Sequence, residues 1–501
     1  MMKSLLSSVG SYRRASGLPQ RTLALALGLL VALSAFAGAQ TWTRLTHSPT
    51  INASTALLLT DGTVMVQGES TINWWKLTPD NTGSYINGTW TQLANMPTGY
   101  SPLYYASAVL PDGRVIVEGG EYINNVSTFS SKGAIYNPVT NTWTSVSPPS
   151  GWSGGIGDAQ SVVLANGTFM LANPLNTKAA FLNASTLTWT AATTTGKTGA
   201  NDEEGWNLLP NGKVLTVDCN NTSNLKNSEI FNPTSGGWTS AGSTIVQLPD
   251  TTSSGGGSHE IGPAVLRPNG TVFATGALPH TAVYNTATAT WSAGPNFPST
   301  LDIADGPASI LPNGNVLVDA SPGVFNNGSV FFEFNGTSLV SVPAVPNAAT
   351  VPSYEGRMLV LPTGQVLFTD GVTDVEVYTA AGTYQAAWQP TISSFPSSVS
   401  SGSLNNFISG TQFNGLSQGA AYGDDAQAAT NYPLVRITNN TTHHVFYCRT
   451  HTHSTMGVAT GSATVSTQFD VPATIESGLS QLVVVANGIP SAPVTITVVT
   501  P

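Results

Sequence analysis

The sequence predicts an all-β protein in which a seven-bladed β-propeller is followed by an immunoglobulin-like β-sandwich, and three observations support this fold class. A short apolar strand runs into a tight turn and back out seven times along the chain. The turn glycines are 44 to 58 residues apart, a period near 50 that is typical of kelch-type propeller repeats. After residue 388 these turns stop, and alternating strand sequence continues without them.

The seven repeated turns are of the kind that joins two antiparallel strands. Six of them have Asn or Asp before the glycine, and these residues tolerate the positive φ that a two-residue hairpin demands. The turns are Asp61-Gly62, Asp112-Gly113, Asn166-Gly167, Asn211-Gly212, Asn269-Gly270, Asn313-Gly314 and Thr363-Gly364. We therefore expect residues 40–388 to form seven blades around a central channel.

Tryptophans mark the outer strand of the blades. Five repeats carry one there, and they are Trp90, Trp143, Trp189, Trp238 and Trp291. We expect these side chains to pack the blades rather than to bind a ligand. A further segment of this kind, Trp42-Thr43-Arg44-Leu45, precedes the first repeat. It is expected to complete the last blade, so that the ring closes and no sheet edge stays open.

Residues 389–501 are expected to form the sandwich. Runs such as PLVRIT, TVSTQFDV and SQLVVVANGI have the alternation of half-buried strands. Gly423-Asp424-Asp425 lies in a loop of this region, where turn chemistry explains it better than a calcium site does.

Residues 1–39 have the pattern of a signal peptide. Basic residues precede an apolar run at 23–37, and small residues follow at 37–39. Arg13-Arg14 leaves open whether export uses the general or the twin-arginine route. No other stretch is long enough to span a bilayer. We expect a secreted, monomeric protein, extracellular or periplasmic.

Composition limits the partners. Only 8% of residues are charged, and the net charge of −10 reflects a scarcity of Lys and Arg. Because no basic stripe exists, nucleic acid is excluded as a partner.

Cys219 and Cys448 are the only cysteines. They either form one disulfide or are two buried thiols, and the sequence leaves both open.

One register position of the repeat is rich in carboxylates. Eight or nine residues before the seven hairpin turns the chain has, in blade order, Asn52, Tyr104, Asp158, Glu203, Glu260, Asp305 and Glu355. Since each begins an innermost strand, we expect these side chains, together with Tyr354 beside Glu355, to surround one cavity on the propeller axis. Carboxylates that converge in this way repel one another, so that either their pKa values rise or a positive group compensates them.

Three kinds of compensation remain open. The segment with Arg449, His451 and His453 could plug the channel and pair with the ring. A divalent metal could bind carboxylates, with Ca²⁺ suiting an all-oxygen set and Mn²⁺ or Zn²⁺ a set that includes His453 or His451. The carboxylates could also act as an acid/base pair on a sugar without metal.

A secreted kelch propeller followed by an immunoglobulin-like domain resembles the copper-radical oxidases, the family of galactose oxidase and glyoxal oxidase. The resemblance implies copper on the propeller axis, bound by two tyrosines and two histidines. The stretch YYASAVLPDGR places Tyr104 at the first tyrosine, and Tyr354 matches the second. The Thr-His context at 450–454 offers His453, or less well His451, as the histidine from the C-terminal domain.

Two departures from the family pattern change the expected chemistry. Glu355 stands where the family has the histidine that follows its second tyrosine, and no cysteine lies near Ala53, where the family's crosslinking cysteine would fall. Glutamate in place of histidine favours harder metals than copper. The first expectation is therefore binding, with or without processing, of an extracellular carbohydrate. The alternatives are a copper-dependent oxidase of primary alcohols or aldehydes that releases hydrogen peroxide, and a non-catalytic surface or matrix protein.

Overall fold

The computed structural model describes residues 40–500 except 153, 252–257, 419 and 423–430. The expected signal peptide, residues 1–39, and the Gly423-Asp424-Asp425 loop lie outside the described residues. From residue 39 onward the chain forms one compact unit. No helix in the described part of the chain is long and apolar enough to cross a membrane.

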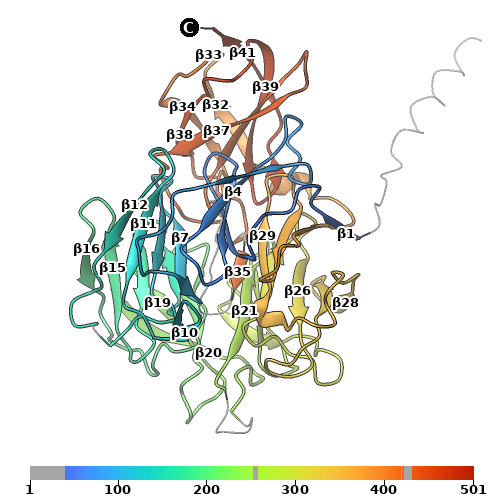
Figure 1. The fold of residues 1–501 in the computed structure, drawn as a ribbon. Coiled ribbons are helices and arrows are strands. Elements are labelled where there is room, and N and C mark those ends of the chain that lie inside the picture. Colours follow the sequence, from blue (N-terminus) through green and yellow to red (C-terminus); the bar gives the residue numbers. More distant parts are fainter. Residues whose placement is uncertain (1–39, 153, 252–257, 419, 423–430, 501) are drawn as a thin grey trace, which may run out of the picture. The chain divides into compact units, whose positions relative to one another are not determined.

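Seven antiparallel sheets form the blades, six of them with four strands and one with a fifth strand added, which confirms the predicted all-β propeller (Figure 1). Blade 1 contains β2 (Ala53–Leu58), β3 (Val64–Gly68), β4 (Trp74–Thr78) and β5 (Thr89–Gln92). Blade 2 contains β7 (Ala106–Val109), β8 (Val115–Glu118), β11 (Gly133–Asn137) and β12 (Thr142–Val146). Blade 3 contains β13 (Ser161–Val163), β14 (Phe169–Ala172), β15 (Ala179–Asn183) and β16 (Thr188–Ala191).

The remaining blades repeat this order. Blade 4 contains β17 (Asn207–Leu208), β18 (Val214–Val217), β19 (Asn227–Asn232) and β20 (Gly237–Ser243). Blade 5 contains β21 (Ile261–Leu266), β22 (Thr271–Gly276), β23 (Ala282–Asn285) and β24 (Thr290–Ala293). Blade 6 contains β25 (Pro307–Ile310), β26 (Val316–Ala320), β27 (Val330–Phe334) and β28 (Leu339–Ser341). Blade 7 contains β29 (Arg357–Val360), β30 (Val366–Thr369), β31 (Glu376–Thr379) and β1 (Thr41–Arg44).

Blade 7 is completed by the start of the chain, as expected. β1 pairs antiparallel with β31, and Trp42 lies opposite Tyr378. The Trp42 ring packs against Phe331, Phe368 and Tyr378, with centroids 4.9–5.5 Å apart. The first and last strands of the ring are thereby joined through backbone hydrogen bonds and an aromatic cluster.

The outer-strand tryptophans also fasten neighbouring blades. Trp143 Nε1 donates to the Ala94 carbonyl (2.9 Å), and Trp189 Nε1 donates to the Ser147 carbonyl (2.7 Å). Each acceptor lies just after the outer strand of the preceding blade. A tryptophan at this register therefore has a packing role, which agrees with the sequence-based expectation.

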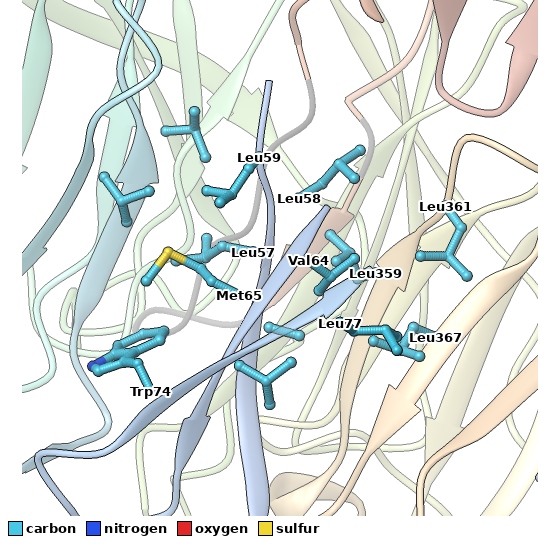
Figure 2. Packing of buried hydrophobic residues seen from close by; sticks show 14 of the residues in the cluster. Leu57, Leu58, Leu59, Val64, Met65, Trp74, Leu77, Leu359, Leu361 and Leu367 are labelled. Atoms are coloured by element: carbon cyan, nitrogen blue, oxygen red, sulfur yellow. The ribbon is translucent and has the colours of Figure 1, made fainter. Parts of the chain in front are cut away.

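Apolar innermost strands build the core because both of their faces are covered. Every residue of β2 is buried. Figure 2 shows leucines of blade 1, Leu57 to Leu59 and Leu77, facing Leu359, Leu361 and Leu367 of blade 7. Inter-blade contacts of this kind bury both faces of each sheet.

An insertion in blade 2 forms a small three-stranded sheet of β6 (Pro102–Leu103), β9 (Tyr122–Ile123) and β10 (Val126–Ser127). Two 3₁₀ turns complete the propeller region, η1 (Ser353–Glu355) before β29 and η2 (Ala386–Trp388) after blade 7.

The C-terminal strands form one curled nine-stranded sheet in which β37 pairs with both β36 and β38. Its halves enclose a separate core that includes Ile408, Val435, Phe469 and Ile496. The strands are β32 (Thr391–Ser394), β33 (Ser398–Ser400), β34 (Asn406–Thr411), β36 (Leu434–Asn439), β37 (Val445–His451), β38 (Val465–Asp470), β39 (Gly478–Ala486), β40 (Ile489–Pro490) and β41 (Val494–Val499).

One strand of the C-terminal region leaves this sheet and joins the propeller. β35 (Ala420–Tyr422) pairs antiparallel with β25 and also lies against β21 and β29, the innermost strands of the neighbouring blades (Figure 1). The segment that enters the ring of innermost strands is therefore β35. The sequence had favoured 449–454 for this role.

Both cysteines are buried thiols that no disulfide joins in the structure. Of the two alternatives that the sequence left open, the structure has the one without a disulfide.

Candidate functional site

A cavity of about 460 Å³ lies where the innermost strands of six blades begin. Neither Asn52 nor Glu355 is among the residues that line it, but six of the residues expected around the axis are, namely Tyr104, Asp158, Glu203, Glu260, Asp305 and Tyr354. Five further residues complete the lining, namely Leu103, Glu121, Tyr122, Asn125 and Phe325. The common register of the repeat thus brings side chains from blades 2 to 7 to one place.

The backbone enters the cavity in the same unusual conformation in five blades. Tyr104, Glu203 and Asp305 have φ values of 50°, 57° and 54°, in the left-handed region. In blades 3 and 5 the residue before the carboxylate takes this conformation instead, Gly157 at 60° and His259 at 61°. A non-glycine residue held there costs about 1 kcal/mol or more, and such strain gathers at functional sites.

Three carboxylates from adjacent blades form the tightest cluster. Glu203, Glu260 and Asp305 each offer an oxygen, and these oxygens lie within 4.8 Å of one another. The Asp305 amide donates to the carbonyl of Ile261, the residue after Glu260, and this bond fixes blade 6 against blade 5 (2.9 Å). The arrangement could hold a hard cation, because oxygen ligands are those that Ca²⁺ and Mn²⁺ prefer.

A buried ion-pair network supports Glu203 from behind. The Lys197 ammonium lies 2.7 Å from Glu204 Oε1 and 2.8 Å from Glu229 Oε2, and all three side chains are buried. Burial acts to raise the pKa of Glu204, and the adjacent Lys197 ammonium opposes this rise. The Cys219 thiol donates to the Glu203 carbonyl (2.9 Å). These contacts lock the turn at residues 202–204 that carries Glu203.

Aromatic rings also line the cavity. Tyr104 packs edge-on against Tyr122 with ring centroids 6.0 Å apart, and its ring centroid is 6.4 Å from that of Tyr354. Phe325 packs against Tyr354 at 5.3 Å and is 45% exposed. Glu121, Tyr122 and Phe325 line the cavity but were not expected there from the sequence. The only hint for the first two was the long segment between Gly119-Gly120 and Gly133, which exceeds a simple connection.

Glu355 follows Tyr354 in η1, and it is not among the residues that line the cavity. Burial raises its pKa, while a hydrogen bond from Tyr354 and the charge of Arg357 act in the opposite direction. The Arg357 guanidinium donates to the Tyr354 carbonyl (2.8 Å) and lies 5.5 Å from the Tyr104 ring centroid. Arg357 therefore braces the two tyrosines from outside the cavity.

The structure gives the two candidate histidines other partners. His453 Nδ1 is hydrogen-bonded to Thr467 Oγ1 (2.9 Å), and its ring stacks on Tyr432. Burial lowers the pKa of His453 to about 3. His451 Nε2 lies 3.1 Å from Asp470 Oδ1. Neither histidine is among the residues that line the cavity.

The position of these histidines follows from where their segment meets the propeller. The Thr450 amide donates to the Thr60 carbonyl (3.0 Å), and Arg449 lies near the Asp112 carbonyl. Those carbonyls are in the hairpin turns, at the end of the innermost strands opposite to the cavity. The eight residues from Tyr104 to Asp112 span about 25 Å when extended. The expectation that His453 lies near Tyr354 or Glu355 is therefore wrong. The segment has its own partner, because Asp470 pairs with Arg449 and His451.

The donor set of the cavity does not fit the copper site that the resemblance implies. Tyr104 and Tyr354 are present, but no described histidine lines the cavity, and carboxylates surround the tyrosines. Such oxygens suit Ca²⁺ or Mn²⁺ better than copper, which favours imidazole and thiolate.

Comparison with a solved structure supports the fold. No family model matches the chain, and no curated protein matches it. Among solved structures, a fungal alcohol oxidase of the AA5 family in complex with copper is 14% identical with a TM-score of 0.50, covering 92% of this chain and 100% of that chain. The extracellular domain of a hybrid two-component system from B. thetaiotaomicron has 10% identity and a TM-score of 0.45, covering 93% of this chain and 59% of that chain. At such identities the likeness to the fungal oxidase shows a shared fold.

Proposed function

We propose that this protein binds a carbohydrate outside the cell, in the cavity at the start of the innermost strands, with a hard divalent cation on Glu203, Glu260 and Asp305. The observation that carries the proposal is the convergence of carboxylates and aromatic rings in one cavity large enough for a sugar ring. A pocket that combines apolar walls with a few convergent polar groups is the usual form of a small-ligand site.

The two walls suit the two sides of a sugar. Ionised carboxylates accept strong hydrogen bonds from hydroxyl groups. The faces of Tyr104, Tyr354 and the partly exposed Phe325 offer apolar area to the C–H side of the ring. A cation held by three carboxylates would offset their repulsion and retain open positions for sugar hydroxyls.

Calorimetric titration of the full chain tests the cation and the sugar separately. We expect Ca²⁺ or Mn²⁺ to bind with 1:1 stoichiometry, and Glu260→Gln to weaken this affinity about 10- to 100-fold. Asp112→Asn, in an exposed hairpin turn, is the matched control and should bind the cation like the wild type. Neutral, N-acetylated and amino oligosaccharides are then titrated in the presence of the cation. If none of the sugars produces heat at a protein concentration high enough to reveal millimolar affinity, carbohydrate binding is refuted.

The alternative is a copper-dependent oxidase of primary alcohols or aldehydes. The fold likeness and the proximity of Tyr104 to Tyr354 favour it, whereas the carboxylate donor set opposes it. Stoichiometric copper in the purified protein, with hydrogen peroxide released from a primary alcohol, would establish the oxidase in place of the sugar-binding protein.

A further inference from the structure

The walls of the cavity carry more negative charge than one divalent cation can offset. Five carboxylates line it, Glu121, Asp158, Glu203, Glu260 and Asp305, and no Lys, Arg or His belongs to the described lining. A divalent cation on the last three leaves one negative charge there. Glu121 and Asp158 add two more, so the wall retains a net charge of −3 when all five are ionised.

Glu121 and Asp158 stand apart from the three-carboxylate cluster and are brought together by close backbone packing. The Gly120 amide donates to the Gly157 carbonyl at 2.5 Å, so the residues just before Glu121 and Asp158 are in direct contact. Gly119 has φ +86°, and a side chain there would collide with the Gly157 carbonyl. Glycine is required for this approach, which places carboxylates of blades 2 and 3 on one side of the cavity.

Two aromatic rings adjoin this pair of carboxylates. Tyr104 and Tyr122 meet at an interplanar angle of 75°, and both line the cavity. The Tyr122 hydroxyl is coupled electrostatically to Glu121 and Asp158, and their negative charge raises its pKa. Carboxylates combined with the faces of tyrosines are the groups that bind an ammonium ion, through charge and through cation–π attraction.

We propose that the carbohydrate carries a free amino group, and that its ammonium binds between Glu121 and Asp158 against the rings of Tyr104 and Tyr122. This inference rests on the proposed function and names its substrate class, a sugar with an unacetylated amine. An N-acetylated or neutral sugar brings no positive charge to these carboxylates, whereas an ammonium forms charge-assisted hydrogen bonds with them.

The test compares three oligosaccharides of equal length by calorimetric titration of the full chain, in calcium buffer at pH 6. They are oligomers of glucosamine, of N-acetylglucosamine and of glucose. We expect the glucosamine oligomer to bind at least about 10-fold more tightly than the other two at low salt, and this preference to shrink at high salt because charge carries it. Glu121→Gln and Asp158→Asn should each reduce the preference about 10-fold, while Asp112→Asn should leave it unchanged.

The outcomes separate this inference from the proposed function. Equal affinity for all three oligomers, or a preference that survives in the Glu121→Gln and Asp158→Asn double variant, overturns the ammonium site and leaves carbohydrate binding in place. Binding of none of the three overturns the proposed function itself. Spermidine that binds as tightly as the glucosamine oligomer overturns the requirement for a sugar. Circular dichroism and thermal unfolding check that each variant is folded.

Discussion

Single residues in this protein place ionisable groups where water does not reach. Glu118, at the end of β8, is fully buried, and neither carboxylate oxygen has a hydrogen-bond partner among the described residues. Burial raises its pKa well above 4.5. The folded state therefore keeps this proton to a higher pH than the unfolded state does.

This raised pKa predicts how Glu118→Gln changes stability with pH. Above pH 4.5 the unfolded state loses the proton first, so the wild type loses about 1.4 kcal/mol of unfolding free energy per pH unit at this group, until the folded carboxyl also ionises. Glutamine has no proton to release. We expect the stability of Glu118→Gln relative to the wild type to rise as the pH increases above 5 in urea unfolding, measured between pH 5 and pH 8. A difference that stays constant across this range would show that Glu118 is ionised in the folded protein.

The buried ion pairs of Lys197 also predict how its substitution changes stability. Its ammonium is enclosed by Glu204 and Glu229, and Lys197→Met would leave two buried carboxylates without their cation. Removing one partner of a buried ion pair costs about 3–5 kcal/mol. We expect Lys197→Met to lower the midpoint of chemical unfolding accordingly, and the double variant with Glu204→Gln to recover part of the loss. Unchanged stability of the single variant would contradict the buried network.

At the scale of strands and turns, local sequence determines most of the architecture. Asn-Gly and Asp-Gly turns, apolar innermost strands and outer-strand tryptophans are short-range patterns, and they predicted the blades, the closure by β1 and the register of the cavity residues. The β6–β9–β10 insertion, which brings Glu121 and Tyr122 to the cavity, depends on contacts that Gly119 and Gly120 make with another blade. No local pattern encodes such a contact.

The strand β1 allows a test of ring closure. Trp42→Ala removes the ring contacts with Phe331, Phe368 and Tyr378, together with the Nε1 bond to the Pro343 carbonyl (2.7 Å). We expect a loss of about 3 kcal/mol in unfolding free energy, near the lower end for a large aromatic because Trp42 is only partly buried. Thr41→Ala, an exposed neighbour in the same strand, should have little effect. Equal effects of the two substitutions would mean that Trp42 does not fasten the ring.

At the scale of the whole molecule, the choice of the segment that enters the propeller could not be made from sequence. The charge of Arg449, His451 and His453 favoured that segment, but Asp470 of the same sheet pairs with Arg449 and His451. β35 enters instead, through backbone pairing with β25 that carries no distinctive side-chain pattern. Backbone hydrogen bonds between distant strands depend on the assembled fold.

The two parts of the chain share a hydrophobic core. Tyr432, Met456 and Val485 of the C-terminal region belong to the same buried cluster as the leucines of blades 1 and 7. The Tyr432 hydroxyl donates to the Leu58 carbonyl, and the Met456 amide donates to the Ala165 carbonyl (2.9 Å). An interface with a large apolar core and buried backbone bonds should not open independently of the parts that it joins.

We therefore predict that the full chain unfolds in a single calorimetric transition. Residues 40–388 expressed alone would expose the β25 edge and the apolar side chains that Tyr432 and Met456 cover, so this fragment should unfold at a lower temperature or aggregate.

Tyr432→Phe tests the interface with a minimal change. It removes the hydroxyl and leaves a buried carbonyl unpaired, which costs about 1–3 kcal/mol, and it should shift the single transition downward without splitting it. Two separate transitions in the unaltered chain would show that the propeller and the C-terminal sheet fold independently, and that the shared cluster contributes little to their stability.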